Sequence, residues 1–212
     1  IITRDGVRIA FVGAITNDTP NIVMPGYVAD KNFTDAATEI NSVAKNLKDN
    51  NQADVIIAVV HEGEGTLDTI VNKLTNVSAV FGGHTHTVEQ KIVNGIPVIN
   101  ASSSGKGYAD LKMTVSPDMK VSFPSVTSSY VALNNANGYT STNPIVDPQV
   151  QKIVSDAKAE VGPIFDEVIG NISTDLTRSQ DQQPYGESQL GNWASDVVKN
   201  YAKADVGVAN NG

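Results

Sequence analysis

The first 81 residues alternate short apolar runs with segments in which apolar residues recur at helical spacing. The apolar runs are typical of strands buried on both faces, and the periodic segments are typical of amphipathic helices. In chain order the pattern predicts a strand at residues 8–15, a helix at 34–50, a strand at 54–60, a helix at 66–74 and a strand at 79–81. This alternation favours an α/β fold with a parallel sheet and right-handed crossovers.

The pattern becomes mostly β after this region. The Asn94-Gly95 pair lies between apolar flanks, which is a strong hairpin signal. Further antiparallel strands are expected at residues 110–115 and 120–126. Residues 128–148 are rich in Ser, Thr, Asn and Pro, a mixture typical of a connection. We therefore expect the first domain to end near this segment.

Helical spacing returns in the last third of the chain. The pattern predicts a helix at residues 148–161, a strand at 165–172, a helix at 187–202 and a strand at 205–209. The order indicates the start of a second α/β domain.

Composition excludes several classes of function. The 212-residue chain carries a net charge of -8 with a sequence pI near 4.7, which argues against binding to a nucleic acid polymer. It has no cysteine, so a transition-metal site must use histidine, carboxylate or amide ligands. No apolar run approaches the ~18–20 residues that span a bilayer, and the first residues lack a charged leader with a cleavage site. Nothing in the sequence indicates an oligomeric state.

The three histidines follow predicted strands. His61 comes directly after one strand, and His84 and His86 follow the next strand across a Gly-Gly pair. The carboxyl ends of parallel strands share one edge of the sheet, where ligands bind in open α/β folds. We expect the glycines to let the backbone turn sharply there and bring His84 and His86 into one pocket. Imidazole is a common ligand of zinc, manganese and iron, so the three residues are candidate metal ligands.

Other interpretations compete with this one. A lone histidine after a strand is more often a hydrogen-bonded loop residue than a ligand, so the metal hypothesis depends on all three together. Three imidazoles could also hold a single catalytic zinc, but the sequence offers no obvious general base or bridging carboxylate at another strand end. The acidic residues near His61 are expected to be solvated rather than ligands; they are Glu62, Glu64 and Asp68.

Several motifs together resemble a known family. VVHEG at residues 59–63 and FGGHTHT at 81–87 resemble the last two metal-binding motifs of calcineurin-like metallophosphoesterases, and GVRIAFVGAIT at 6–16 resembles the strand between the two halves of that domain. ESQLGNWASDVV at 187–198 and ADVGVANNG at 204–212 are similar to the opening of the C-terminal domain of the 5'-nucleotidase family. That family includes 2',3'-cyclic-nucleotide phosphodiesterases and UDP-sugar hydrolases.

The resemblance implies a fold, a chemistry and a location. It implies a four-layer α/β/β/α catalytic domain with two divalent metal ions, such as zinc or manganese, and a metal-activated hydroxide that attacks a nucleotide phosphate ester. His61 and His84 would bind one metal ion and His86 the other, while Asn210 would contact the nucleotide substrate. The protein would be a bacterial hydrolase of nucleotide catabolism, secreted or held at the cell surface. For Glu187 and Asn192 we favour structural roles over functional ones. Glu187 would be an acidic residue at the start of a helix, and Asn192 a polar residue packed between domains.

The domain boundaries follow from the same likeness. Residues 1–127 would be the C-terminal half of the metallophosphoesterase domain, 128–163 a linker and connecting helix, and 164–212 the truncated start of the C-terminal domain. The Asp-x-His, Gly-Asp and Asn-His motifs of the family do not occur in this sequence. We therefore expect an internal fragment that is inactive alone. The alternative is an exported surface binding module on a catalytically dead phosphoesterase scaffold.

Overall fold

The computed structural model describes residues 1–123, 129–132, 147–179 and 186–209. The chain divides into two compact units, Ile1–Pro144 and Ile145–Gly212. Among the described residues, no helix combines the length and the apolar character needed to cross a membrane.

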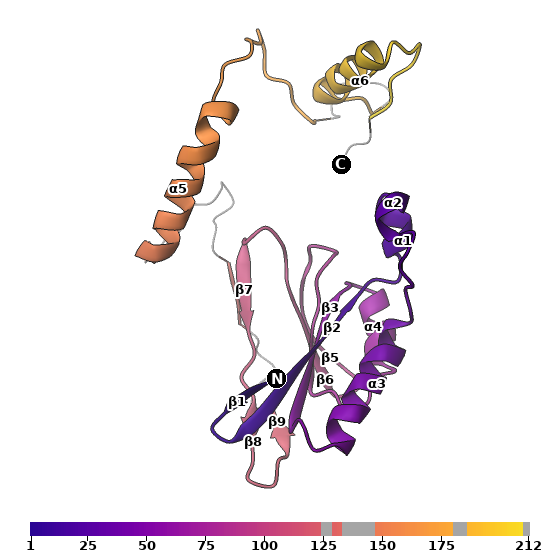
Figure 1. Cartoon of the computed structure of the whole chain (residues 1–212), viewed down its shortest axis with the longest axis vertical. Helices are drawn as coiled ribbons and strands as arrows, with labels where there is room; N and C mark the ends of the chain where they lie inside the picture. The colour runs from indigo at the N-terminus through magenta and orange to yellow at the C-terminus, as the bar shows by residue number, and fades with distance from the viewer. Residues whose placement is uncertain (124–128, 133–146, 180–185, 210–212) are drawn as a thin grey trace. The chain divides into compact units, whose positions relative to one another are not determined.

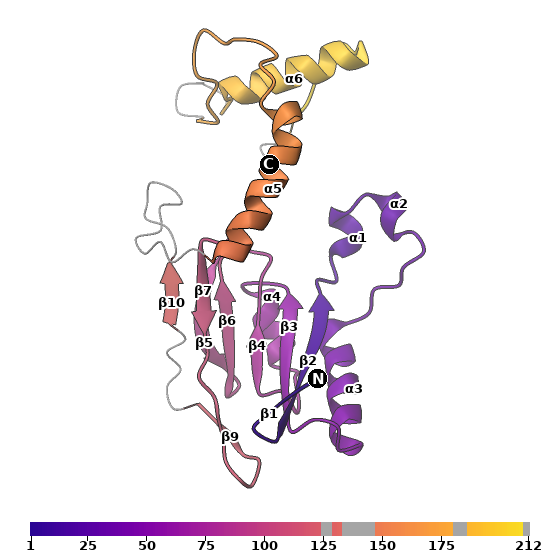
Figure 2. The ribbon, with the colours of Figure 1, turned by 60° about the vertical axis from the view of Figure 1, so that its left-hand side comes forward.

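A six-stranded mixed sheet forms the centre of the first unit (Figure 2). Its four inner strands run parallel, and an antiparallel strand lies at each edge. This confirms the predicted α/β class. In spatial order the strands are β1 (Ile2–Arg4), β2 (Val7–Ile15), β3 (Val55–His61), β4 (Ala79–Phe81), β6 (Ile96–Ala101) and β5 (Val88–Val93).

Two helices cover one face of this sheet, as Figure 1 shows with the sheet nearly edge-on. They are α3 (Ala36–Asp49), whose N-cap Asp35 accepts a hydrogen bond from the Thr38 amide, and α4 (Thr66–Val71). Their apolar residues pack with alternate residues of the strands, and Ile40 and Leu67 are almost fully buried in this core. Both helices match predicted ones to within a few residues. Two short helices, α1 (Thr19–Ile22) and α2 (Pro25–Val28), lie in the loop after β2.

Within the described part of the first unit, the opposite face of the sheet is only partly covered. Val55 and Ile57 pack there against apolar residues of the segment that contains β8 (Thr114–Val115) and β9 (Val121–Ser122). Farther along the strands on this face, Phe11, Ile15 and Val59 are 52%, 51% and 46% exposed. A large apolar area therefore remains at the end of the sheet that carries His61.

The antiparallel region differs in detail from its prediction. The hairpin of β5 and β6 turns at Asn94-Gly95 as expected. The single strand predicted at residues 110–115 is wrong: β7 (Gly107–Asp110) ends where it was expected to begin and pairs with β10 (Ser129–Ala132), whereas β8 pairs with β9. β10 lies in the segment predicted as a connection, and the end of the strand predicted at 120–126 lies outside the described residues.

The second unit is helical in its described part. It contains α5 (Pro148–Phe165) and α6 (Gln189–Ala202), and the N-cap Ser188 of α6 accepts a hydrogen bond from the Gly191 amide. The strands predicted at residues 165–172 and 205–209 are wrong, because α5 runs through Phe165 and no strand is formed at 166–172 or 205–209. A strand needs a neighbour for its backbone hydrogen bonds, and the described part of this unit contains none.

Candidate metal centre

The carboxyl edge of the parallel sheet carries the candidate site. β3 ends at His61, and the loop from Gly82 to Thr87 follows β4, its parallel neighbour. Because neighbouring parallel strands end at the same edge, the two segments begin close together. The fold therefore places His61 beside the loop that carries the other two histidines.

The structure brings His61 and His84 into direct contact. His61 Nε2 and His84 Nδ1 lie 3.3 Å apart, and the two ring centroids are 5.0 Å apart with an interplanar angle of 63°. At this distance one nitrogen can donate a hydrogen bond to the other only if one carries a proton and the other presents a lone pair. Two ring nitrogens at this separation are also close enough to bind one cation that lies beside the line between them.

His86 does not take part in this contact. Its side chain is exposed, and its backbone carbonyl accepts a hydrogen bond of 3.1 Å from Ser102 Oγ. No hydrogen bond or ring contact joins it to the other two histidines, all three of which the structure describes. His86 is therefore near the pair in sequence but is not part of the contact.

The loop adopts its shape through the histidines rather than through the glycines expected to provide the turn. His84 and His86 have φ of 68° and 59°, in the left-handed region, whereas Gly82 and Gly83 are not among the residues with positive φ. That part of the expectation is wrong. Non-glycine residues in this region carry backbone strain and are concentrated at functional sites.

The glycines are needed because other groups approach them closely. A Cβ at Gly82 would lie 2.5 Å from Leu67 Cδ2. One at Gly63 would lie 2.7 Å from the Gly83 carbonyl oxygen and would also overlap the Thr85 side chain. The absence of side chains therefore lets the loop after β4 pack directly on the loop after β3.

Backbone hydrogen bonds hold the two loops together. The Gly83 amide donates to the Glu62 carbonyl at 2.9 Å, and the Gly82 amide donates to the Ile99 carbonyl of β6 at 2.7 Å. The Gly83 carbonyl accepts from Asn100 Nδ2 at 3.2 Å. The residue before His84 is thus fixed from both sides.

The nearby carboxylates do not point into a common site with the imidazoles. Glu62 is buried, and its Oε1 accepts from the adjacent Gly63 amide at 3.2 Å. Asp68 and Glu89 both accept a hydrogen bond from Lys91 Nζ, at 3.0 and 2.8 Å. These two hydrogen bonds raise the pKa of Lys91, and the bond to Asp68 has the larger effect. In the described part of the chain, no group of three His, Asp or Glu side chains is placed to hold a metal ion.

The His61–His84 pair nevertheless fits two positions of a metal centre. Two nitrogens bound 2.0–2.1 Å from one tetrahedral zinc are about 3.3–3.4 Å apart, which agrees with the 3.3 Å between His61 Nε2 and His84 Nδ1. A catalytic zinc takes three protein ligands and keeps one open position. The pair therefore supplies part of such a donor set, and a complete centre needs further ligands.

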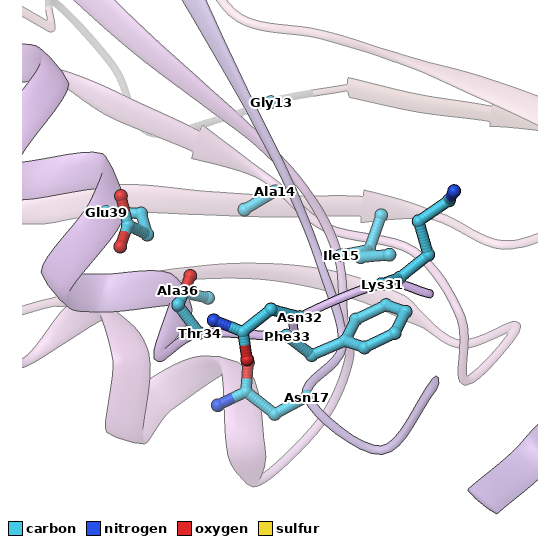
Figure 3. Close-up of a pocket in the computed structure, with 10 residues that line it drawn as sticks. All are labelled: Gly13, Ala14, Ile15, Asn17, Lys31, Asn32, Phe33, Thr34, Ala36 and Glu39. Carbon is cyan, nitrogen blue, oxygen red and sulfur yellow. The ribbon is translucent and has the colours of Figure 1, made fainter. Parts of the chain in front are cut away.

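A separate pocket of about 460 Å³ lies at the carboxyl end of β2 (Figure 3). None of its lining residues is a histidine, and Lys31 Nζ already pairs with Asp30 Oδ2 at 2.6 Å. Sequence reasoning did not find this pocket, because its wall combines the end of a strand with a polar loop that has no motif. The lining residues are Gly13, Ala14, Ile15, Asn17, Lys31, Asn32, Phe33, Thr34, Ala36 and Glu39.

The residues of the second unit that resembled family positions are only partly described. Asn192 Nδ2 donates to Glu187 Oε2 at 2.8 Å, and both side chains are exposed at the start of α6. This local hydrogen bond is a structural role of the kind expected for Glu187. Asn210, the predicted substrate contact, lies outside the described residues.

Comparisons with known proteins find sequence relatives that match along almost the whole chain. Endonuclease YhcR of Bacillus subtilis is 25% identical over 222 residues, which cover 100% of this chain and 17% of YhcR. The cell wall protein Lmo0130 of Listeria monocytogenes is 24% identical (98% of this chain, 30% of that protein), and the trifunctional nucleotide phosphoesterase protein YfkN of Bacillus subtilis is 25% identical (100% and 14%). The chain spans less than a third of the length of each of these relatives. No protein-family model matches it.

Solved structures agree on the fold. The 5'-nucleotidase precursor from Thermus thermophilus superposes with a TM-score of 0.64 at 20% identity, over 94% of this chain and 41% of that one. The NAD nucleotidase NadN of Haemophilus influenzae gives a TM-score of 0.62 at 17% identity, over 94% and 45%. Sequence relatives that match along almost the whole chain and a shared fold lead to the same conclusion: the chain is related to the 5'-nucleotidase family of nucleotide phosphoesterases.

Proposed function

We propose that this chain contributes part of the metal site of a phosphoric ester hydrolase that acts on nucleotides, as a 5'-nucleotidase or a 2',3'-cyclic-nucleotide phosphodiesterase. The observation that carries the proposal is the 3.3 Å contact between His61 Nε2 and His84 Nδ1 at the carboxyl edge of a parallel sheet. The pair would bind one divalent cation and His86 a second. The name of YfkN, a nucleotide phosphoesterase, supports the substrate class.

The histidines would present imidazole nitrogens to a cation from fixed positions. His61 is fixed by the end of β3, and His84 by a loop whose preceding residue is hydrogen-bonded through both its amide and its carbonyl. Divalent cations held there would polarise the phosphoryl group, activate water and offset the charge that develops on the phosphoryl oxygens. The rest of the donor set would come from elsewhere in a longer protein.

The exposed apolar face of the sheet supports a longer catalytic domain. Phe11, Ile15 and Val59 lie on the face opposite α3 and α4, on the side to which His61 also belongs by strand alternation. Contiguous apolar surface of this kind is normally covered by another layer. We propose that a second sheet carries the remaining metal ligands over this face, and that the 212-residue chain alone is inactive.

We also propose that the protein is exported to the cell surface. The relative Lmo0130 is named a cell wall protein, and the absence of cysteine is compatible with an exported bacterial protein. In the second domain, Asn210 would contact the nucleotide.

Release of phosphate from AMP, and of adenosine monophosphate from 2',3'-cyclic AMP, tests the function. A longer gene product that includes this chain should hydrolyse at least one of them when supplied with zinc or manganese, and the same protein with His84→Ala should be inactive. The 212-residue chain should show no turnover. Hydrolysis of AMP by the purified chain alone would contradict the fragment proposal. A longer protein that binds the metal but hydrolyses neither ester would instead favour the surface binding module.

A further inference from the structure

Two side chains at the end of β6 bind backbone carbonyl groups of the loop from Gly82 to Thr87, which we call the histidine loop. Asn100 Nδ2 donates to the carbonyl of Gly83 at 3.2 Å, and Ser102 Oγ donates to the carbonyl of His86 at 3.1 Å. The Ser102 amide also donates to the Thr87 carbonyl at 2.9 Å. The strand end therefore touches the loop on both sides of the residues His84 and Thr85.

Asn100 is an unusual residue for its surroundings. It is 1% exposed in the apolar strand β6, and its Oδ1 is buried with no hydrogen-bond partner among the described residues. A buried amide with one unsatisfied oxygen is unfavourable for folding compared with an apolar side chain of similar size. Within this side chain only Nδ2 makes a hydrogen bond to the described residues. The bond to the Gly83 carbonyl therefore accounts for a polar residue at this buried position.

The held carbonyl determines where His84 lies. The Gly83 amide is bonded to the Glu62 carbonyl, one residue after His61, and the Gly83 carbonyl is bonded to Asn100. With both groups fixed, the peptide plane that leads into His84 cannot rotate freely. His84 then leaves this plane with a left-handed φ of 68°, and its ring meets His61.

We propose that Asn100 is a positioning residue for the candidate metal centre: through the Gly83 carbonyl it keeps the imidazole of His84 against that of His61. The positioning of His84 by Asn100 does not depend on the proposed function. Only its use in metal binding rests on that function. Groups that orient metal ligands from outside the coordination shell typically change metal affinity 10- to 100-fold when they are removed.

Asn41 provides a matched control. Its Nδ2 also donates to a backbone carbonyl, that of Lys73, at 2.8 Å, and its Oδ1 accepts from the Thr75 amide at 2.7 Å. These bonds join α3 to the loop before β4, and Asn41 makes no hydrogen bond to the histidine loop, which the structure describes in full. Loss of this amide should weaken the fold without moving His84.

The first test is made by NMR on the metal-free 212-residue chain. The wild type and Asn41→Ala should show nuclear Overhauser effects between the rings of His61 and His84, and Asn100→Ala should lose them while keeping the amide spectrum of a folded protein. Ring contacts that persist in folded Asn100→Ala would overturn the proposal. If that variant does not fold, the wild type provides the test. We expect a through-hydrogen-bond coupling from Asn100 Nδ2 to the Gly83 carbonyl carbon, and its absence would also overturn the proposal.

The second test titrates Zn²⁺ alone while the ring signals of His61 and His84 are followed. Asn100→Ala should raise the dissociation constant by about 10- to 100-fold, and Asn41→Ala should leave it unchanged within error. Equal affinities for the wild type and Asn100→Ala would overturn the positioning role. If wild-type signals do not respond to Zn²⁺ while the ring contacts depend on Asn100 as expected, the pair is not a zinc site in this chain, and the positioning of His84 by Asn100 stands.

Discussion

His61 Nε2 lies 3.3 Å from His84 Nδ1, although 23 positions separate the two residues in the chain. The contact requires the end of β3, the parallel pairing of β3 with β4, and two loops that lack side chains at Gly63 and Gly82. It brings two imidazole nitrogens to the separation that two ligands of one tetrahedral zinc adopt, about 3.3–3.4 Å. Each part of this arrangement can be changed separately.

The histidines should differ in their contribution to zinc binding. We expect His61→Ala and His84→Ala each to abolish measurable Zn²⁺ binding at the pair, because one imidazole alone cannot hold the ion at micromolar concentrations. His86→Ala should leave this binding intact, since its ring makes no contact with the other two. Isothermal titration calorimetry on the three variants measures this order. A loss of zinc affinity with His86→Ala as large as that with His84→Ala would show that His86 binds the same ion.

Close packing of the two loops predicts opposite results for two glycines. Gly63→Ala places a Cβ against Thr85 and 2.7 Å from the Gly83 carbonyl oxygen, whereas a Cβ at Gly13 in β2 meets nothing within 4 Å and Gly13 has no positive φ. Overpacking of this kind typically costs about 1–3 kcal/mol. The free energy of unfolding in urea should therefore fall by about this amount for Gly63→Ala and hardly change for Gly13→Ala. Equal values for the two variants would contradict the close approach.

The ion pair of Arg8 and Asp54 predicts how stability depends on pH. Asp54 accepts from the Arg8 side chain at 2.6 and 2.9 Å and from the Arg8 amide at 2.8 Å. The side-chain hydrogen bonds, followed by the backbone one, lower the pKa of Asp54 from 3.8 to about 2. Because the folded pKa is the lower one, the stabilisation is complete above pH ~4 and is lost as pH falls through ~2.

Asp54→Asn isolates this contribution. The difference in the free energy of unfolding between the wild type and Asp54→Asn should be largest at pH ~5 to ~7 and should shrink between pH ~4 and ~2. Urea unfolding followed by circular dichroism across this range measures it. A difference that stays constant down to pH ~2 would mean that Asp54 is not stabilised as a carboxylate by Arg8.

Zinc should stabilise the chain only weakly. A ligand that binds the folded state adds RT ln(1 + [L]/Kd), which is about 0.4 kcal/mol at a free concentration equal to Kd. With two imidazoles in place of a complete donor set, the dissociation constant should be high, so Zn²⁺ at concentrations below it should hardly change the melting temperature. A melting temperature that rises by many degrees at low micromolar Zn²⁺ would show that the chain carries a complete site.

The first unit was predictable where the sequence has strong periodicity. The apolar run before His61 and the amphipathic helix after residue 34 match β3 and α3 closely, because buried strands and one-sided helices impose their periods on the sequence. Placing His61 and the later histidines at one edge followed from parallel strand order alone. The contact between His61 and His84 depends on loop torsions, which leave no periodic pattern in the sequence.

The wrong predictions concern features that depend on contacts between residues distant in the sequence. Residues 165–172 contain Phe165 and several β-branched residues, yet no strand forms there because a strand also needs a partner. Ile169 is instead 95% exposed. The left-handed torsions fall on His84 and His86 rather than on the glycines, while Leu67 and Thr85, distant in sequence, occupy the space beside Gly82 and Gly63. Asn100 carries no motif and becomes visible only through its hydrogen bond.

The location of bound zinc tests the central claim most directly. Crystals of the 212-residue chain grown with Zn²⁺ and measured on both sides of the zinc absorption edge give an anomalous difference map that distinguishes zinc from lighter ions. We predict a peak at ~2.0–2.1 Å from both His61 Nε2 and His84 Nδ1. Zinc bound at other side chains, with the imidazoles of His61 and His84 still in contact and free of metal, would contradict the assignment of this pair as metal ligands.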